Sequence, residues 1–448
     1  MKNKKSGMDR RSFVKASSLA AGGLVMSSSL AAKAYSGGVD DTIKIGLIGC
    51  GGRGTGAIVQ ALSTTQNVKL VAMADAFQDR LDKCFEHVTQ QTYTDASSEQ
   101  EVRINDRVDV ANEHKFVGFD AYKKVLPLVD VVILTTPPGF RPMHFEAAVE
   151  AGKHIFTEKP MATDAPGIRR VLVAAEKAKA KKLNVVVGLQ RRYQKIYTEW
   201  VERMREGVIG DITTSHVYWN SGGVWVRPRE EGQTEMEYQM RNWYYFNWLC
   251  GDHITEQHIH NIDVSNWVKD AFPVSAYGMG GRRMRTGKDH GEIFDHHFIE
   301  FEYADGSKMF SQCRHWKGVA NRVTESFQGT NGSAPKPGVL LTKSGYPIMR
   351  YNDKKDPNPY QVEHDVLFEA IAKGEYKFAD AEHGAKSTLT SILGRMATYS
   401  GEIVSWEDAM QSKVDLMPAK LDWNAMPQVK PDANGYYPVA VPGVTKVV

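Results

Sequence analysis

Cysteine is scarce in this 448-residue chain, and its four cysteines lie far apart. No two of them form the C-x-x-C pair that is typical of a zinc site or a dithiol redox centre, so the sequence favours neither. We expect free thiols. Disulfides would be compatible with an exported protein, but spacing alone cannot pair these residues. The four are Cys50, Cys84, Cys250 and Cys313.

Long apolar runs, internal repeats and an excess of one charge are also missing. No stretch reaches the ~20 consecutive apolar residues of a membrane span. The formal net charge is +3, and residues 1–34 hold seven basic side chains and one acidic, so the rest of the chain carries −3. We therefore expect no membrane span and no nucleic-acid partner. The length predicts two to three domains.

Residues 1–34 have the order of an export signal. Arg10 and Arg11 are followed by Phe13, by a weakly apolar stretch rich in Ser, Gly and Ala, and by the small-x-small pattern that ends at Ala34. This order predicts a twin-arginine signal peptide and a periplasmic location. The alternative, a general secretory signal with two incidental arginines, fits the diluted apolar stretch less well.

A glycine cluster follows the first apolar run of the remaining chain, at residues 43–48. Gly49, Gly51 and Gly54 fit G-x-G-x-x-G, in which the glycines allow a tight turn, close approach of a pyrophosphate and close packing of the following helix. A second apolar run, 68–73, ends at Asp75, whose carboxylate is placed to bind the adenosine ribose. A glycine-rich loop before an ordinary surface helix would leave this acid unexplained.

The cofactor that this pattern predicts is NAD. Asp75 would repel the 2′-phosphate of NADP, and Ala76 and Phe77 after it offer no group that such a phosphate prefers. Arg53 and Arg80 are the nearby cations that would favour NADP instead.

Alternating strands and helices over residues 41–188 predict an α/β fold with an N-terminal Rossmann dinucleotide-binding domain. Further strands are expected at 131–134, 154–156 and 184–188, with a polar surface excursion at 88–114. Residues 189–400 predict a substrate-binding and oligomerisation domain of the α+β class, with a large, mostly antiparallel open sheet. Residues 401–448 predict an extended C-terminal tail.

Two short motifs follow predicted strands, Thr135-Thr136-Pro137-Pro138 and Glu158-Lys159-Pro160. Strand carboxyl ends are where open parallel sheets bind ligands. With the glycine fingerprint and His144, these motifs resemble the Gfo/Idh/MocA family of sugar oxidoreductases over roughly residues 41–400. The expected cofactor-binding residues are Gly49, Gly51, Gly52, Arg53, Gly54, Asp75, Thr135, Thr136, Pro137, His144, Glu158 and Lys159.

The resemblance also implies the catalytic residues. In that family the lysine of E-K-P lies beside the nicotinamide and the reacting hydroxyl, which assigns this role to Lys159. Without the resemblance, Glu158 and Lys159 would be a surface ion pair before a proline-started helix. The family's second domain often carries an acid, a histidine four residues on and an acid three further. His260 is therefore the expected proton acceptor.

Glu256 and Asp263 flank His260 at helical spacing and are expected to bind substrate from one helix face. Two departures from the family pattern, Glu256 in place of Asp and His258 in place of a small residue, leave the substrate preference open. Arg192 and Tyr193, at the start of the second domain, are expected to make further substrate contacts.

No metal site is expected, because the spacing of His253, His258 and His260 lacks the i, i+4 pair of H-E-x-x-H. Packing and substrate contact are equally open for His253 and His258. The aromatic residues between Tyr218 and Trp248 would suit sugar stacking, but for most of them we expect a place in the core or at a subunit interface.

These patterns predict an exported NAD-dependent oxidoreductase acting on a sugar, glycoside or cyclic polyol, with a tightly held nicotinamide. One alternative is a glycosidase that oxidises, eliminates and re-reduces its substrate; another is a non-catalytic cofactor-binding protein, against which the Lys159–His260 pair argues. A homodimer or homotetramer is expected, formed through the open face of the second sheet.

Overall fold

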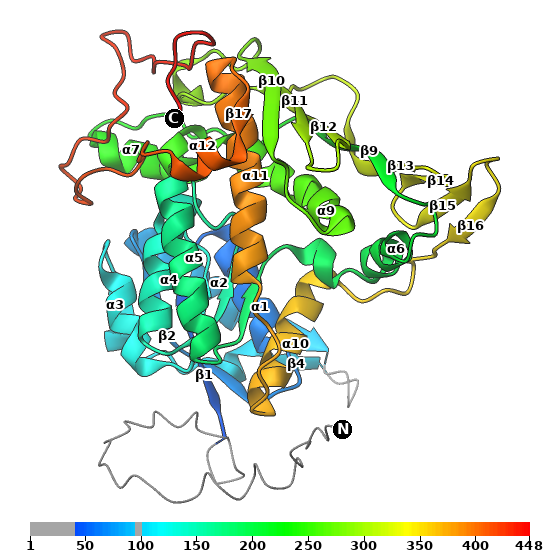
Figure 1. Ribbon diagram of the computed structural model, residues 1–448. Coiled ribbons are helices and arrows are strands. Elements are labelled where there is room, and N and C mark those ends of the chain that lie inside the picture. Colours follow the sequence, from blue (N-terminus) through cyan, green and yellow to red (C-terminus); the bar gives the residue numbers. More distant parts are fainter. Residues whose placement is uncertain (1–40, 95–100) are drawn as a thin grey trace, which may run out of the picture.

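The computed structural model describes residues 41–94 and 101–448 (Figure 1). The predicted signal peptide at residues 1–34 lies outside this part. The first domain contains a six-stranded parallel sheet in the order β5-β2-β1-β6-β7-β8. Its strands are β1 (Ile43–Ile48), β2 (Val68–Asp75), β5 (Lys115–Val117), β6 (Val131–Leu134), β7 (His154–Thr157) and β8 (Val185–Val187).

Both faces of this sheet are covered, which explains why its strands are continuously apolar. In β6, Val131 and Ile133 pack into one hydrophobic cluster and Val132 and Leu134 into another, because successive side chains of a strand point to opposite faces. The crossover helices are α1 (Gly52–Leu62), α2 (Gln78–Thr89), α3 (Ala121–Val125), α4 (Arg141–Glu150) and α5 (Ala165–Ala180). Since β1 lies between β2 and β6, the strand order reverses beside its carboxyl end, where such sheets bind ligands.

The excursion at residues 88–114 contains a small hairpin of β3 (Thr92–Thr94) and β4 (Glu101–Arg103). It leads into β5, an edge strand beside β2 that the sequence did not predict. Three residues are too few to show a strand period, so the sequence gives no signal for β5.

The second domain contains a nine-stranded sheet in the order β16-β15-β14-β13-β9-β12-β11-β10-β17. Every neighbouring pair is antiparallel except β9 and β12, which confirms the predicted fold class. The strands are β9 (Ile212–Ser221), β10 (Ser275–Gly281), β11 (His296–Glu302), β12 (Lys308–His315), β13 (Arg322–Gly329), β14 (Gly332–Lys336), β15 (Val339–Thr342), β16 (Pro347–Arg350) and β17 (Val404–Ser405).

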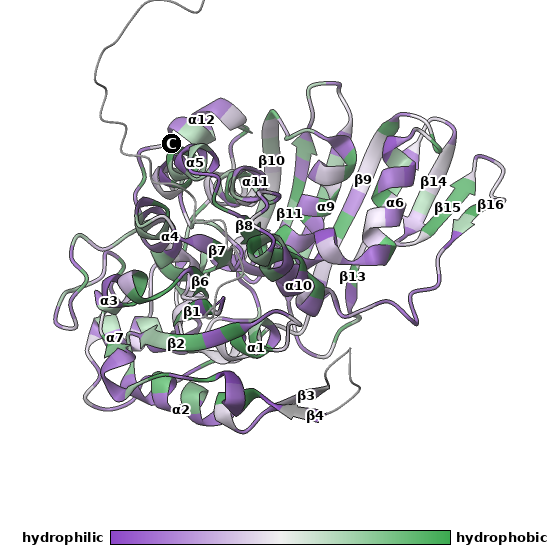
Figure 2. Ribbon diagram, turned by 90° about the horizontal axis from the view of Figure 1, so that it is seen from below, coloured by the Kyte–Doolittle hydropathy of each residue, from purple (hydrophilic) through white to green (hydrophobic). Residues whose placement is uncertain are grey.

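Helices cover one face of this sheet and connect it to the first domain. Figure 2 shows α6 (Lys195–Arg205) and α9 (Ile259–Lys269) lying over the strands on one side. The long α11 (Ala381–Ser400) packs on β10 and also on α5, so it lies between the two domains (Figure 1). Helix α10 (Pro359–Ala372) returns to the first domain and packs on α1.

The end of the chain wraps over the domains instead of forming another layer. The predicted tail at 401–448 begins with β17 and α12 (Trp406–Gln411), and from Ser412 to Val448 it has no helix or strand. In Figure 1 this red segment runs past α7 (Glu235–Arg241). No helix in the described residues is long and apolar enough to cross a membrane.

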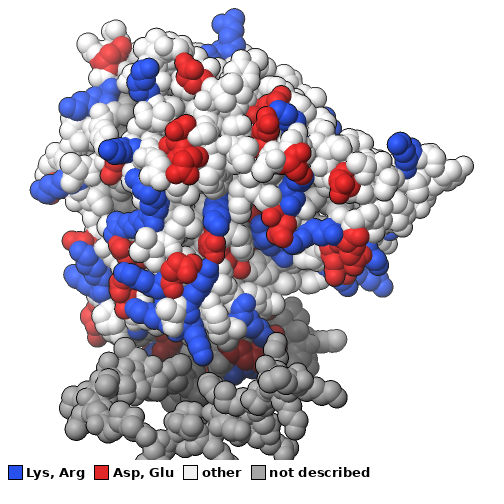
Figure 3. All heavy atoms as spheres, in the orientation of Figure 1, with Lys and Arg blue, Asp and Glu red and all other residues white. Residues whose placement is uncertain are grey.

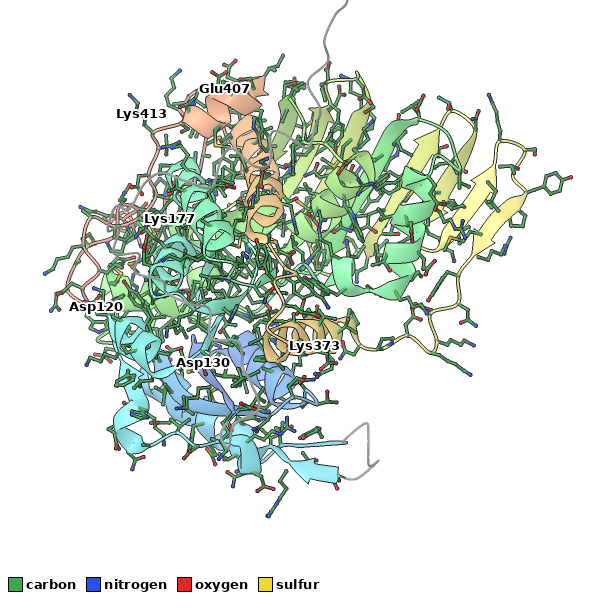
Figure 4. The ribbon with its side chains drawn as sticks, turned by 60° about the horizontal axis from the view of Figure 1, so that its bottom comes forward. Asp120, Asp130, Lys177, Lys373, Glu407 and Lys413 are labelled. Atoms are coloured by element: carbon green, nitrogen blue, oxygen red, sulfur yellow. The ribbon has the colours of Figure 1, made fainter. Side chains whose placement is uncertain are left out.

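Charged side chains of both signs are interspersed on the face drawn in Figure 3. The six residues labelled in Figure 4, among them Lys177, Lys373 and Glu407, lie at the outside of the molecule.

Candidate active site

The turn between β1 and α1 is built for close approach of backbone to a ligand. Gly49 has φ +103°, and a Cβ on it would lie 2.6 Å from the Thr136 nitrogen. A Cβ on Gly54 would lie 1.9 Å from the Gly49 carbonyl oxygen, so Gly54 serves the packing of α1 on β1. Gly51 and Gly52 instead have nothing within 4 Å of the position of a Cβ. Helix α1 has no side-chain cap and no acidic residue in its first turn, which suits a pyrophosphate at its N-terminus.

Asp75 holds this turn from the end of β2. Its carboxylate accepts hydrogen bonds from the Cys50 nitrogen at 2.6 Å and the Phe77 nitrogen at 2.9 Å. Burial raises the pKa of Asp75, and these two bonds oppose that rise. Each carboxylate oxygen keeps acceptor capacity for a ribose hydroxyl. The glycine cradle and Asp75 therefore fit a dinucleotide.

The ends of β6 and β7 are fixed by a residue that the sequence analysis missed. Arg141, almost fully buried at the start of α4, donates to the carbonyl oxygens of Leu134, Thr136 and Glu158. Burial lowers the pKa of Arg141 to about 10. Its position, four residues after Pro137, carried no signal, because the acceptors are backbone atoms at and just after the ends of two different strands.

A cavity of about 590 Å³ extends from this turn to the second domain. It is lined by every predicted cofactor-binding residue except Gly54, and by Glu256 and His260 from the second domain. His144 lies in its wall, buried, with Nδ1 3.1 Å from the Thr136 hydroxyl. Burial lowers the pKa of His144 to about 3, so this imidazole is neutral.

Lys159 and Glu256 form an ion pair between the domains inside the cavity. Lys159 Nζ donates to Glu256 Oε1 at 2.9 Å and also to the Glu256 carbonyl oxygen. The two side chains are only 12% and 14% exposed, so the pair is little screened by solvent. The lysine is thereby held with its ammonium group toward the second domain.

His260 lies beside this pair, with 8% of its surface exposed. Its ring stacks on Trp219 at a centroid distance of 6.0 Å, and its Nδ1 is buried without a hydrogen-bond partner. Burial, and then the positive charge of Lys159, keep the pKa of His260 well below its usual value. His260 is therefore neutral.

Arg53 joins the glycine turn to the E-K-P segment and to α10. Its guanidinium bonds Glu158 and contacts Glu363 at 3.3 Å, while Tyr360 lies under it at 5.1 Å. Glu363 is fully buried and was not predicted from the sequence, since it is 310 residues away along the chain. Arg53 is thus occupied by two carboxylates.

Arg192, Tyr193 and Asp263, expected as substrate contacts, do not line the cavity. Arg192 donates two bonds to Asp263, at 2.8 and 2.9 Å, and the Tyr193 hydroxyl donates to Asp380. The expected single helix face is interrupted, because residues Ile254–His258 form a π-helical turn, η7, before α9 begins. The wider turn brings Glu256 and His260 to the cavity, whereas Asp263 meets Arg192.

His253 and His258 are hydrogen-bonded packing residues away from the cavity lining. His258 Nε2 lies 2.8 Å from the Ser311 hydroxyl. His253 belongs with Asp252 and His297 to a buried group of metal-ligating residue types. The Asp252 carboxylate accepts hydrogen bonds from the Tyr399 hydroxyl, the Phe294 nitrogen and His253.

The aromatic residues between Tyr218 and Trp248 divide into two sets. Tyr244, Tyr245, Phe246 and Trp248 are buried in the core. Trp219, Trp225 and Trp243 line the cavity. The sequence could not predict which of these residues lie in the core and which line the cavity, since all of them belong to one aromatic-rich stretch.

Comparison with known proteins agrees with this geometry. Residues 43–187 match the model of the Gfo/Idh/MocA family, described as an oxidoreductase family with an NAD-binding Rossmann fold. An inositol 2-dehydrogenase of Cereibacter sphaeroides is 27% identical over 360 residues, which are 78% of this chain and 92% of that protein.

Two solved structures share the fold. The aldose-aldose oxidoreductase from Caulobacter crescentus superposes with a TM-score of 0.61 and 18% identity, covering 81% of this chain and 99% of that one. Scyllo-inositol dehydrogenase from Lactobacillus casei, solved with NAD(H) and scyllo-inositol, superposes with a TM-score of 0.57 and 18% identity. The match covers 82% of this chain and 99% of that one.

Because several histidines are buried and neutral, we expect the stability of the fold to fall at acid pH, and substitution of His258 tests this expectation. Burial lowers its pKa to about 3, so between that value and its unfolded value of ~6.5 the unfolded state binds more protons. Stability is therefore lost as the pH falls through this window, by about 1.4 kcal/mol for one histidine between pH 7.5 and 5.5. In urea unfolding, the free energy of unfolding of His258→Gln should fall less between pH 7.5 and 5.5 than that of the wild type, and the difference should be this amount. The exposed His87→Gln should keep the wild-type drop; an unchanged drop in His258→Gln would contradict the assignment.

Proposed function

We propose that this chain is an oxidoreductase of the Gfo/Idh/MocA family, an NAD-dependent dehydrogenase that oxidises a secondary hydroxyl of a sugar, glycoside or cyclic polyol. The observation that carries the proposal is the meeting of Lys159, Glu256 and His260 in the cavity that begins at the glycine turn. A protein that only binds the cofactor would need no such proton-transfer pair in the same cavity.

The relatives support the substrate class. The similar curated protein is named an inositol 2-dehydrogenase, and one fold neighbour was solved with scyllo-inositol. Inositol and scyllo-inositol are cyclic polyols. In this chain, Trp219 Nε1 and His260 Nδ1 are buried polar atoms without partners in the cavity wall, which suits a ligand with several hydroxyl groups.

The residues of the site divide the work of the reaction. Gly51, Gly52 and Asp75 would hold the dinucleotide, which supplies the two-electron oxidation of the hydroxyl-bearing carbon. The Lys159 ammonium donates a hydrogen bond to the substrate oxygen and stabilises its developing negative charge. Neutral His260 accepts the hydroxyl proton. Glu256 orients Lys159, and the stacked Trp219 ring fixes the plane of His260.

Lys159→Ala and His260→Ala should each lower turnover by about 10²- to 10⁴-fold, because each removes a group that acts on the reacting hydroxyl. Bound dinucleotide should be retained, since neither side chain belongs to the glycine turn or Asp75. Initial rates with cyclic polyols and aldoses, and nucleotide content by absorbance, measure both effects. Lys177→Ala on the exposed side of α5 is the control. Near-normal turnover in either site variant would show the assignment to be wrong.

We further propose NAD rather than NADP, and export of the folded holoenzyme. Asp75 would repel a 2′-phosphate, and the contacts of Arg53 with Glu158 and Glu363 leave it unavailable to neutralise one. Arg10, Arg11 and Phe13 support export by the twin-arginine route. Since that route carries folded proteins to a compartment without a large dinucleotide pool, the cofactor must be recycled in place, with one carbonyl reduced for each hydroxyl oxidised.

Protein purified without added cofactor should therefore release about one equivalent of NAD on denaturation. It should also interconvert a polyol and a keto-sugar without external dinucleotide. Enzymatic assay of the supernatant measures the first and product chromatography the second. Empty protein that works only with added dinucleotide, or NADP in the supernatant, would contradict the proposal.

We propose a homodimer or homotetramer formed through the outer face of the nine-stranded sheet. The face opposite α6 and α9 carries neighbouring large side chains, with Tyr277, Met279 and Phe298 exposed and Phe310 stacked beside Phe298. A second copy would bury this surface. Multi-angle light scattering at micromolar concentration should give a mass of two or four chains. The mass of one chain is 50.0 kDa before that of the signal peptide is subtracted. A monomeric mass would refute it.

A further inference from the structure

Three arginines line the cavity together with Asp75 and Phe77, and one of them, Arg241, lies over the Phe77 ring. Arg80 comes from α2 of the first domain. Arg227 lies in the segment that follows β9, and Arg241 ends α7, so two of the three belong to the second domain. None of them is part of the glycine fingerprint or of the proton-transfer site.

Their positive charge is incompletely neutralised. Arg241 pairs with Asp79 at 3.0 Å and with Glu237 at 3.4 Å. Within residues 41–94 and 101–448, Arg80 and Arg227 have no carboxylate within ion-pair distance, and the Arg227 guanidinium lies 5.0 Å from the centre of the Trp225 ring. Burial, and the neighbouring charges of Arg80 and Arg241, lower the pKa of Arg227. Grouped cations of this kind are stabilised by an anion.

The wall behind these arginines is made by the second domain and the tail. Arg241 lies 4.0 Å above the Phe77 ring, and Trp423 of the tail packs on Phe77 and Phe119 at 5.0 and 4.6 Å. Gln239 holds the tail by donating to the Val429 carbonyl oxygen at 2.8 Å. The part of the cavity beside Asp75 is thus enclosed by segments of the first domain, the second domain and the tail.

We propose that Arg80, Arg227 and Arg241 bind a phosphate group of the dinucleotide, so that the second domain closes over the adenosine half of the cofactor and retains it. This inference rests on the proposed function. Guanidinium groups match phosphate oxygens in geometry as well as charge. Two sources offer that chemistry: the pyrophosphate, which NAD and NADP share, and the 2′-phosphate, which NADP alone carries.

The test measures dissociation constants of NAD⁺ and NADP⁺ by calorimetry, on full-length protein freed of nucleotide with charcoal. Arg227→Gln and Arg80→Gln should each raise the dissociation constant about 10- to 100-fold. Each variant should also lose bound nucleotide faster than the wild type during gel filtration. Arg283→Gln is the matched control, because it removes an exposed arginine of the same domain outside the cavity. Unchanged melting temperatures identify variants that fold normally, and Arg80→Gln lies on a different element should Arg227→Gln fail to fold.

Equal losses for both dinucleotides would support the proposal with the pyrophosphate as the ligand. A loss confined to NADP⁺ would support it with the 2′-phosphate as the ligand, and would overturn the proposed preference for NAD. Wild-type affinity in both variants would overturn it while leaving the proposed dehydrogenase intact. A wild-type protein that binds neither dinucleotide would overturn the proposed function itself.

Discussion

The ion pair of Lys159 with Glu256 is the interaction on which the site depends, because it connects a loop at the end of a parallel strand to the π-helical turn of the second domain. Its two bonds, to the carboxylate and to the carbonyl oxygen of the same residue, fix both the side chain and the backbone of η7. His260 follows four residues later and is therefore carried to the same place. This contact joins the two domains directly at the site, in addition to the packing of α11 on both of them.

Burial gives each charged group of the site a separate task. The low pKa of His260 has the same origin as the strength of the ion pair, because both follow from exclusion of water and from the nearby ammonium group. A neutral imidazole beside a cation can accept a proton while the cation stabilises the oxygen that loses it. Arg53 extends this network to the glycine turn through Glu158, the residue next to Lys159. The glycine turn and the residues proposed to transfer the proton are thus parts of one connected set of charges.

Local patterns explain what the sequence predicted correctly. Glycines, the acid at the end of β2 and the alternation of apolar runs are encoded within ~30 residues, so the parallel sheet, its turn and the fold class followed from them. The predicted strands at 131–134 and 154–156 correspond to β6 and β7. The second, mostly antiparallel sheet was visible for the same reason, since its strands alternate and are separated by turn residues.

Contacts between distant segments explain what the sequence did not reveal. Arg141 binds backbone carbonyls, which have no residue signature. Glu363 meets Arg53 across 310 residues, and Trp423 reaches Phe77 from the tail. Arg192 was expected to contact substrate because it lies at the start of the second domain, and Asp263 because it lies at helical spacing from His260. In the structure the two side chains bind each other. Their role as substrate contacts stays a prediction, while their ion pair supplies a structural reason for both residue types.

The central claim is that this cavity couples a bound nicotinamide to the hydroxyl group of a cyclic polyol or sugar. Single-turnover absorbance at 340 nm tests it most directly, with the holoprotein mixed in turn with inositols, aldoses and glycosides. The account predicts a stoichiometric rise with at least one of these compounds, slowed when the reacting carbon carries deuterium. Absence of any rise from protein shown to contain oxidised NAD would contradict it.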